Sequence, residues 1–363
     1  MRIGVIGPIW LNIPPQGYGG TEEVVYNLVN GLVDKGNDVT LFGPKTSKVK
    51  AKVFPTVDTP LRDQSVDWTN ITFILNHITT AFEHASEFDI LHMHLNKSQD
   101  YVALPIALYS KTPVLFTLHF KLPSPDYYHD RLAVLNKYRE YPFTSISNSQ
   151  REGLRLNYVA TVYNSLQLEN FTYREKPEDY FVWLGKIKPV KGTKEAILAA
   201  KKANARLYIL GPVDRGVAEY VEYYEKEVKP LVDGKQIIEL GEVDARQRDD
   251  YLGKAKAMLN PISWDEPFGL VMAEAQATGT PVISFNKGAA PELIVDGKTG
   301  FLVNDLDEMV EKMGQIKNLD RQACRRNVED RFTVEKMVEG YESAYNLTIK
   351  NWPEYVKKQK DIL

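Results

Sequence analysis

Two glutamates that could hold the two ends of one elongated ligand occur in the segment Glu266-Pro-Phe-Gly-Leu-Val-Met-Ala-Glu274. Proline suits the first helical position, so the sequence predicts a helix over Pro267–Ala277. The amides left unpaired at that start would be those of Phe268, Gly269 and Leu270. At roughly 1.5 Å per helical residue the two glutamates would lie about 12 Å apart, the reach from a sugar across a diphosphate to a ribose. The alternative is a capping acid and a surface glutamate.

A loop with three lysines is the second candidate site. It reads Gly185-Lys-Ile-Lys-Pro-Val-Lys-Gly192 and joins an apolar run to a predicted helix. Cationic side chains and free amides at a helix start suit phosphate oxygens. The spacing of glycine and lysine is not that of a P-loop. We interpret Lys186 and Lys191 as phosphate ligands, and Lys188 as a member of a solvated charge run.

A glycine-rich loop follows the first apolar run of the chain and reads Pro14-Pro-Gln-Gly-Tyr-Gly-Gly-Thr-Glu22. Glycines let backbone amides approach an anion, and a helix that begins near Thr21 would add its positive end. The spacing is not that of a dinucleotide-binding fingerprint. A flexible turn with a threonine N-cap explains the loop equally well, and the sequence leaves both interpretations open.

All the histidines fall in the first half of the chain: His77, His84, His92, His94, His119 and His129. His92 and His94 end one apolar run and His119 ends another, where a polar ring can bind a ligand or move a proton. We interpret His119 as functional and His92 as structural, and leave His94 open. His77 and His84 lie in a helical pattern and are expected at the surface. The carboxylate pattern of a catalytic metal is missing, so no metal site is predicted.

The composition predicts a two-domain globular enzyme. The chain has 363 residues, of which 43% are hydrophobic and 26% charged. A net charge of -3 argues against a nucleic-acid partner. The single cysteine, Cys324, excludes an intrachain disulfide and fits a reducing compartment. The first apolar run meets Pro8 and is too short for a signal peptide, and no run is long enough to span a membrane. We therefore expect a cytoplasmic protein.

The elements that must position these residues alternate between strand and helix twice along the chain. Strands are predicted over Arg2–Ile6, Asp38–Phe42, Ile90–Met93, Val114–Leu118 and Thr144–Ser147, and then over Tyr180–Leu184, Arg206–Leu210, Ile237–Leu240, Ala257–Asn260, Pro281–Ser284 and Gly300–Val303. Further helices are predicted over Thr21–Lys35, Thr193–Ala203 and Ala245–Ala255. This alternation predicts an α/β protein with two Rossmann-like, doubly wound parallel sheets. Such sheets bind ligands beyond their carboxyl ends, so we expect both domains to face a central cleft.

The polar stretch Leu168–Asp179 is the predicted linker. It divides the chain into an N-terminal domain over 1–167 and a C-terminal domain over 168–340. The charged tail with interleaved aromatics over 341–363 is predicted to be a helix that packs back on the N-terminal domain.

Together these blocks resemble glycosyltransferase family 4, a family of retaining transferases with the GT-B architecture. The resemblance covers nearly the whole chain, and its most specific part is the pair of glutamates. The other blocks that resemble the family, in the right order, are 19–22, 89–94, 117–119, 145–147, 162–164, 185–192, 277–282 and 296–302.

The resemblance implies a nucleotide-sugar donor, most often a UDP-sugar, bound mostly by the second domain without a metal or other cofactor. The residues implied in catalysis are Glu266 facing the sugar, Lys191 on the diphosphate with Lys186 assisting, and His119 on the sugar. The residues implied in donor binding are Gly19, Gly20, Gly185, Gly241, Val243, Phe268, Gly269, Leu270 and Glu274, the last on the ribose. The acceptor lies mostly on the first domain, where Tyr18 and His94 are the candidate contacts.

Two positions depart from the family pattern. Lys186 stands where the family usually has arginine, which keeps the charge but loses the bidentate fork. Ser165 replaces a common glycine. A sugar-nucleotide-binding protein or an epimerase of similar architecture, without transfer, is the alternative function. The acceptor is left open between a glycan, a lipid-linked molecule and a small molecule, as is peripheral contact with the inner membrane face. The aromatics of 120–129 could stack on an acceptor sugar.

Overall fold

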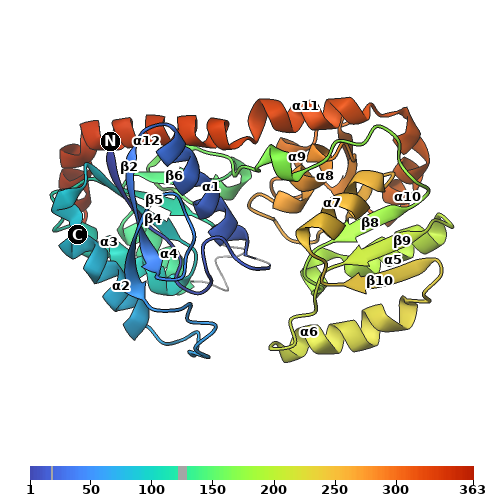
Figure 1. The fold of residues 1–363 in the computed structure, drawn as a ribbon, viewed down its shortest axis with the longest axis horizontal. Coiled ribbons are helices and arrows are strands. Elements are labelled where there is room, and N and C mark those ends of the chain that lie inside the picture. The colour runs from blue at the N-terminus through green and yellow to red at the C-terminus, as the bar shows by residue number, and fades with distance from the viewer. Residues whose placement is uncertain (18, 122–128) are drawn as a thin grey trace. The chain divides into compact units, whose positions relative to one another are not determined.

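The computed structural model describes residues 1–17, 19–121 and 129–363. The chain forms two compact units, each described here by itself: Met1–Ser165 with Val334–Leu363, and Leu166–Thr333 (Figure 1). The boundaries between the units therefore fall after Ser165 and Thr333, whereas the sequence pattern placed them after residues 167 and 340. The second difference arises because the last helix begins at Val334.

The first unit is built on a seven-stranded sheet in the order β3-β2-β1-β4-β5-β6-β7, in which every pair is parallel. Its strands are β1 Arg2–Ile6, β2 Asp38–Pro44, β3 Lys52–Val57, β4 Ile90–Leu95, β5 Val114–Leu118, β6 Phe143–Ser145 and β7 Tyr158–Thr161. The sequence pattern missed β3 and β7, the two edge strands. Both are only partly buried, and β3 contains Pro55, which an edge strand tolerates because one side of it needs no ladder bonds.

The helices of the first unit are α1 Gly20–Asp34, α2 Thr72–Glu83, α3 Ala103–Ala107, α4 His129–Lys137 and α12 Val334–Asp361. The last of these, α12, packs on α1, β5 and β7 (Figure 1). Trp352 of α12 lies in the apolar core of the unit and stacks on Tyr141 with ring centres 5.8 Å apart. The chain's C-terminal helix is thus part of the first unit, although it follows the second unit in sequence.

The second unit has a six-stranded parallel sheet in the order β10-β9-β8-β11-β12-β13. Its strands are β8 Phe181–Leu184, β9 Leu207–Leu210, β10 Ile237–Gly241, β11 Met258–Asn260, β12 Val282–Phe285 and β13 Gly300–Val303. Its helices are α5 Thr193–Lys202, α6 Ala218–Tyr223, α7 Ala245–Lys254, α8 Leu270–Ala277, α9 Ala290–Leu293, α10 Leu306–Gln315 and α11 Arg321–Arg331. The prediction of two doubly wound parallel sheets is confirmed.

Both sheets reverse their strand order beside their first strand. β1 lies between β2 and β4, and β8 lies between β9 and β11. At such a reversal the chains that leave two neighbouring strands turn to opposite faces, which opens a place for a ligand at the carboxyl edge. The two positions to search for a site are therefore the β1–β4 edge and the β8–β11 edge.

His77 is not at the surface, contrary to the sequence-based expectation. It is 2% exposed, with its ring nitrogens 2.7 Å from Thr56 Oγ1 and 3.0 Å from Gly7 O. Burial lowers the pKa of His77 to about 4, so the ring is neutral near pH 7. The polar residue on an otherwise apolar helix face looked solvent-facing, because sequence periodicity cannot show the two hydrogen-bond partners that the fold supplies.

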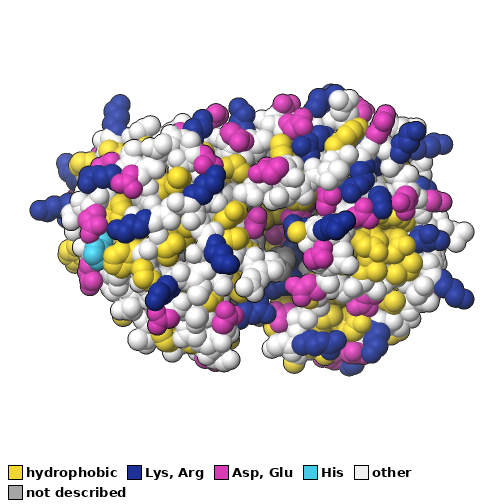
Figure 2. Space-filling model, viewed as in Figure 1, with side chains coloured by type: hydrophobic (Ala, Val, Ile, Leu, Met, Phe, Trp, Pro, Cys, Tyr) yellow, Lys and Arg dark blue, Asp and Glu magenta, His cyan; other side chains and the backbone are white. Residues whose placement is uncertain are grey.

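On the face shown in Figure 2, Lys and Arg side chains are interspersed with Asp and Glu, with no region of one sign. Within the described part of the chain, no helix combines the length and the apolar character that crossing a membrane requires.

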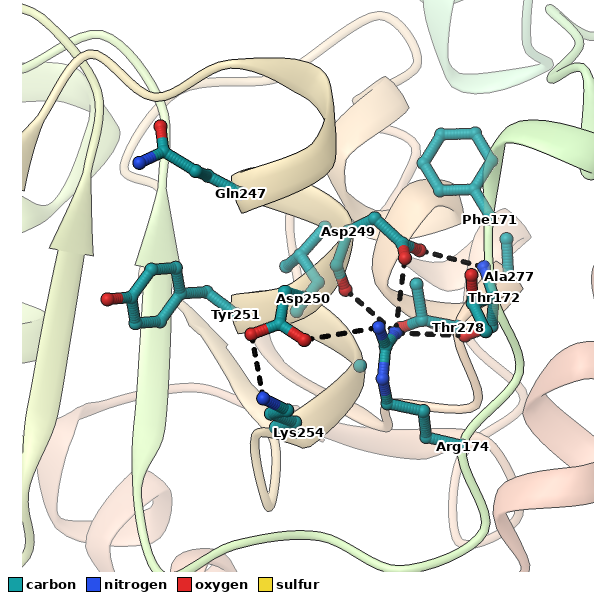
Figure 3. Close-up of polar contacts among 12 residues, drawn as sticks. Phe171, Thr172, Arg174, Gln247, Asp249, Asp250, Tyr251, Lys254, Ala277 and Thr278 are labelled. Atoms are coloured by element: carbon teal, nitrogen blue, oxygen red, sulfur yellow. Dashed lines mark hydrogen bonds and ion pairs between the residues drawn. The ribbon is translucent and has the colours of Figure 1, made fainter.

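The polar stretch predicted as a linker is fixed to α7. Thr172 N donates to Asp249 Oδ1 at 2.7 Å, and the guanidinium of Arg174 contacts Asp249 and Asp250, each at 3.2 Å (Figure 3). Arg174 is therefore the partner of a helix rather than a solvated residue of a free connection.

Arg321 ties that stretch to the sheet. It is 8% exposed and donates to the carbonyls of Arg174, Gly253 and Ala255 and to Thr280 Oγ1, at 2.6–2.8 Å. All four acceptors are uncharged, so the charge is satisfied by dipoles. One side chain thus joins the start of the unit, the end of α7 and the approach to β12.

Arg321→Ala is expected to lower the free energy of unfolding by about 3 kcal/mol or more, because it leaves several buried acceptors without a donor. Arg326→Ala on the same helix is the control. Its guanidinium is half exposed and pairs with an exposed Asp320, so its loss should cost less than about 1 kcal/mol. Urea denaturation of both variants checks this, and equal midpoints would contradict the role given to Arg321.

Candidate active site

An ion pair occupies the reversal point of the second sheet. Lys191, from the loop after β8, contacts Glu266, from the loop after β11, and both side chains are 15% exposed. Trp264 Nε1 donates to Glu266 Oε2 at 3.1 Å, and Lys191 Nζ lies 5.5 Å from the centre of the Trp264 ring. A cation, an anion and an aromatic face thus meet where a doubly wound sheet binds its ligand.

The two loops that carry this pair are locked together by backbone contacts. Gly192 has φ +71°, and a Cβ there would lie 2.0 Å from Pro261 O. Ser263 N donates to Val190 O at 3.0 Å. Only glycine satisfies both the left-handed backbone and the close approach. Gly192 therefore fixes the position of its neighbour Lys191 relative to the loop after β11.

The other two lysines of the loop face different partners. Lys186 Nζ lies 3.8 Å from Asp214 Oδ2, on the loop after β9. Lys188 Nζ lies 5.5 Å from the Trp264 ring centre, and burial, with the charge of Lys191 adding to it, lowers the pKa of Lys188. Lys188 is therefore half-buried beside the ion pair, which corrects its interpretation as part of a solvated charge run.

The helix after Glu266 begins later than the sequence predicted. Helix α8 starts at Leu270, because Gly269 adopts φ +86° and interrupts helical geometry before it. Phe268 turns into the core and packs edge-on against Phe332, with ring centres 5.6 Å apart. The amides of Phe268 and Gly269 are therefore not part of a helical turn. Glu266 lies outside α8, so the 12 Å estimate along one helix axis does not apply.

Glu274 lies inside α8 and is buried, with its side chain 9% exposed. Its Oε1 is 3.2 Å from Arg248 Nη1 of α7, and its Oε2 has no partner among the described residues. Arg248 also lies over the Phe171 ring, 5.8 Å from its centre. The sequence pattern missed Arg248, since nothing in α7 marks one arginine as the partner of a residue on the next helix.

Gly288 holds the backbone of Glu266 in place. A Cβ at Gly288, whose φ is +54°, would lie 2.4 Å from Glu266 N and 2.5 Å from Glu266 O. Ala289 N donates to Glu266 O at 2.9 Å. The loop after β12 thus lies flat against the residue that carries the carboxylate. The sequence pattern did not single out Gly288, because only the tertiary contact gives this glycine its role.

Three glycines line the carboxyl ends of β8, β9 and β10. Gly185 N donates to Leu210 O at 3.0 Å, and Gly211 N donates to Gly241 O at 2.7 Å. A Cβ at Gly211, with φ +136°, would lie 1.8 Å from Gly185 O. Gly185 and Gly241 are thus brought to one edge by Gly211, which the sequence pattern missed, and Val243 follows the same edge.

The first unit shows a similar arrangement at the β1–β4 edge. Helix α1 begins at Gly20, and Thr21 Oγ1 donates to Asn96 Oδ1 at 3.2 Å, which links the loops after the two strands. A Cβ at Gly19 would lie 2.7 Å from Pro15 Cβ, so tight packing alone already requires glycine there. Tyr18, the other candidate of this loop, lies outside the described residues, as do residues 122–128 of the aromatic stretch.

Lys97 lies beside this edge and was missed by the sequence pattern. Its Nζ lies 3.8 Å from the centre of the Trp10 ring, and burial lowers its pKa. Asp100 accepts from the amides of Asn96 and Lys97 at 2.8 and 2.7 Å, and burial raises its pKa to about 6. A short polar cluster therefore closes the loop after β4.

The histidines at the ends of β4 and β5 form two separate contacts. His92 lies between Tyr345 Oη at 2.8 Å and Thr117 Oγ1 at 2.7 Å and is fully buried, which confirms its structural interpretation. His94 Nδ1 lies 2.8 Å from His119 Nε2. Burial lowers the pKa of His119 to about 3, so this ring is neutral near pH 7.

Each unit therefore brings together part of the predicted set. In the second unit, Lys186, Lys191 and Glu266 lie on loops around one reversal point, whereas Glu274 stands on α8 with its own partner. In the first unit, His94 and His119 touch directly. Asp305 caps α10 by accepting from Glu308 N at 2.9 Å.

Comparison with known proteins matches both halves of the chain to glycosyltransferase families. Residues 18–163 match the model of "Glycosyltransferase Family 4" and residues 168–331 match that of "Glycosyl transferases group 1". An uncharacterized 41.2 kDa protein in the cps region of Klebsiella pneumoniae is 28% identical over 72% of this chain and 79% of its own. A trehalose synthase of Pyrococcus horikoshii is 26% identical over 90% and 87%. The structure of Anabaena HepE with UDP-glucose has a TM-score of 0.70 at 17% identity, covering 96% of this chain and 99% of that one.

Gly288→Ala is expected to destabilise the fold more than Gly297→Ala. Both glycines have positive φ, at +54° and +71°, so both variants should lose about 1 kcal/mol from backbone strain. A Cβ at Gly297 meets nothing within 4 Å, whereas one at Gly288 runs into the Glu266 backbone. The extra loss at Gly288 should be about 1–3 kcal/mol. Denaturant unfolding measures it, and equal losses would show that Gly288 does not brace Glu266.

Proposed function

We propose a donor and a chemistry for this protein on the premise that the chain belongs to glycosyltransferase family 4 and is a glycosyltransferase. The protein transfers a sugar from a UDP-sugar to a hydroxyl acceptor, with retention of configuration and without a metal. The second unit binds the donor and the first unit binds most of the acceptor.

The observation that carries this proposal is the contact of Lys191 with Glu266 at the reversal point. When a sugar leaves its diphosphate, negative charge grows on the leaving oxygen and positive charge grows on the adjacent anomeric carbon. An ammonium and a carboxylate held side by side match that pair of charges. Lys191 stabilises the diphosphate and Glu266 the anomeric carbon, and fixed charges of this kind supply much of an enzyme's rate.

The surroundings of the pair support a phosphate ligand. Lys186 and Lys188 stand on the same loop as Lys191, so three cations border one turn of backbone. The ends of β8, β9 and β10 carry Gly185 and Gly241, where the backbone can approach a ligand closely. The positive end of α8, which begins at Leu270, adds a further favourable potential for an anion. These cations supply the positive charge that a metal supplies in other transferases.

Glu274 is the proposed ribose ligand. Its Oε1 is held by Arg248, and its Oε2 is a buried acceptor with no described partner. A ribose hydroxyl can donate to that oxygen and remove the cost of leaving it unsatisfied. Choice of UDP rests on analogy with the structurally similar Anabaena HepE, whose structures contain UDP or UDP-glucose.

The retaining route we propose uses one face of the sugar. The acceptor hydroxyl approaches on the side of the leaving diphosphate, and a diphosphate oxygen takes its proton. Gly19 and Gly20 close on the diphosphate, His119 binds the sugar, and Tyr18 and His94 are the candidate acceptor contacts. Glu266 Oε2 is engaged by Lys191 and Trp264. We prefer the one-face route to a covalent route through this carboxylate. A single buried free cysteine, Cys324, supports action in the cytoplasm.

Lys191→Ala and Glu266→Gln are each expected to lower kcat by about 10²–10³-fold, because each removes a charge that stabilises the transition state. Lys194→Ala is the control. It removes a lysine three positions away whose partner, Glu227, is on the surface, so the rate should stay near that of the wild type. Transfer and donor hydrolysis are measured with a panel of nucleotide sugars.

Near-normal transfer in either site variant would refute its assignment. The rival function, nucleotide-sugar binding or epimerisation without transfer, is separated in the same experiment. Calorimetric binding of a UDP-sugar without transfer or hydrolysis by the wild-type protein would favour a binding protein. A donor sugar recovered with inverted stereochemistry at one carbon would favour an epimerase.

Activity is expected to be unchanged in excess EDTA. In the proposed site Lys191, assisted by Lys186, contacts the diphosphate directly, so removing divalent cations should leave the leaving group stabilised. The rate is compared with and without chelator, and after adding back Mg²⁺ or Mn²⁺. Loss of transfer with EDTA and its recovery with metal would show that the lysine loop is not sufficient.

A further inference from the structure

The contact between His94 and His119 restricts which ring nitrogens can carry a proton. His94 Nδ1 and His119 Nε2 are 2.8 Å apart, and the rings are stacked at 26° with centres 5.0 Å apart. A hydrogen bond between two imidazole nitrogens needs one donor and one acceptor. Burial lowers the pKa of both rings, so near pH 7 both are neutral and share one proton at this contact.

The other nitrogen of His94 decides which ring donates. His94 Nε2 is fully buried and has no hydrogen-bond partner among the described residues. If His119 donated, His94 would have to carry its own proton on Nε2, as a buried N–H without an acceptor. If His94 donates from Nδ1, Nε2 is only a bare lone pair. Unpaired buried N–H groups are rarer than under-satisfied acceptors, so the second arrangement is favoured.

The surroundings of His94 keep its ring in this orientation. The His92 ring lies against it with centres 4.1 Å apart, and His92 is itself held by Tyr345 and Thr117. Along the paired strands, His94 stands opposite Thr117, two residues before His119. A rotation of the His94 ring would therefore have to displace His92, which is buried and held by two hydrogen bonds.

We propose that His94 is a positioning residue that holds His119 in the tautomer protonated at Nδ1, so that His119 donates a hydrogen bond from Nδ1 to an oxygen of the sugar. His119 then acts as a donor and not as a base from Nε2. The inference rests on the proposed function only in taking the sugar as the ligand of His119. Among the described residues, His119 Nδ1 has no hydrogen-bond partner, and it is not fully buried, so it is the nitrogen of this ring that a ligand can reach.

The tautomer can be measured without any substrate. Nitrogen NMR of protein labelled in histidine distinguishes a protonated from a bare ring nitrogen. In the wild type the His119 signal is expected to show protonated Nδ1 and bare Nε2. His94→Phe should convert it to a mixture, while His94→Asn, whose side-chain amide can donate from the position of Nδ1, should restore the wild-type pattern.

His92→Phe is the matched control. It removes a buried histidine from the same strand together with two hydrogen bonds, but it leaves the His94–His119 contact in place. It should destabilise the fold without changing the His119 tautomer. A protonated Nε2 on His119 in the wild type would overturn the proposal, as would a His119 signal that is the same in His94→Phe as in the wild type.

Kinetics give an independent test. The amide of Asn can place its N–H near the position of Nδ1, and that of Gln near Nε2. His119→Asn is therefore expected to keep kcat within about 10-fold of wild type, and His119→Gln to lose about 10²-fold or more, the range for one donor to a developing charge. Higher activity in His119→Gln than in His119→Asn would overturn the proposal. If the wild type transfers no sugar, the proposed function fails, whereas the NMR result still decides the tautomer.

Discussion

The reversal of strand order beside β8 is the constraint on which the candidate site depends. Neighbouring parallel strands β8 and β11 send their following loops to opposite faces of the sheet, so the loops part at the carboxyl edge. Lys191 and Glu266 stand on the two sides of that opening and meet across it. The sheet topology brings these two residues together although they lie 75 positions apart in sequence.

Glycines allow the loops at the carboxyl edge of the second sheet to pack closely. Gly192, Gly211 and Gly288 each adopt positive φ and each approach another backbone within 2.4 Å of where a Cβ would stand. Gly211 brings the loop after β9 against the loop after β8, and Gly192 brings the loop after β8 against the loop after β11. Gly288 brings the loop after β12 against Glu266. The charged groups are therefore carried by backbone that has little freedom to move, which suits electrostatic stabilisation, since a preorganised charge does not have to reorganise during the reaction.

Much of the fold was predictable from the sequence, because buried parallel strands are short apolar runs separated by helical periodicity. The edge strands β3 and β7 were missed, since half-exposed strands lack that signal. The start of α8 was placed three residues too early, because a proline suits a helix start and nothing local shows that Gly269 adopts a left-handed backbone. His77 was placed at the surface because its hydrogen-bond partners, Thr56 and Gly7, come from elsewhere in the chain.

The sequence by itself determined the family, the two doubly wound sheets and the chemical types present in the candidate site: lysines after β8, a pair of glutamates around α8 and histidines at the ends of β4 and β5. These follow from local patterns of charge, glycine and apolar residues. Only the tertiary structure decided which of these groups touch, that Arg248 holds Glu274, that Gly288 braces Glu266 and that His94 engages one nitrogen of His119. Each is a contact between elements distant in sequence, and strand order and loop packing, rather than spacing along the chain, set such distances.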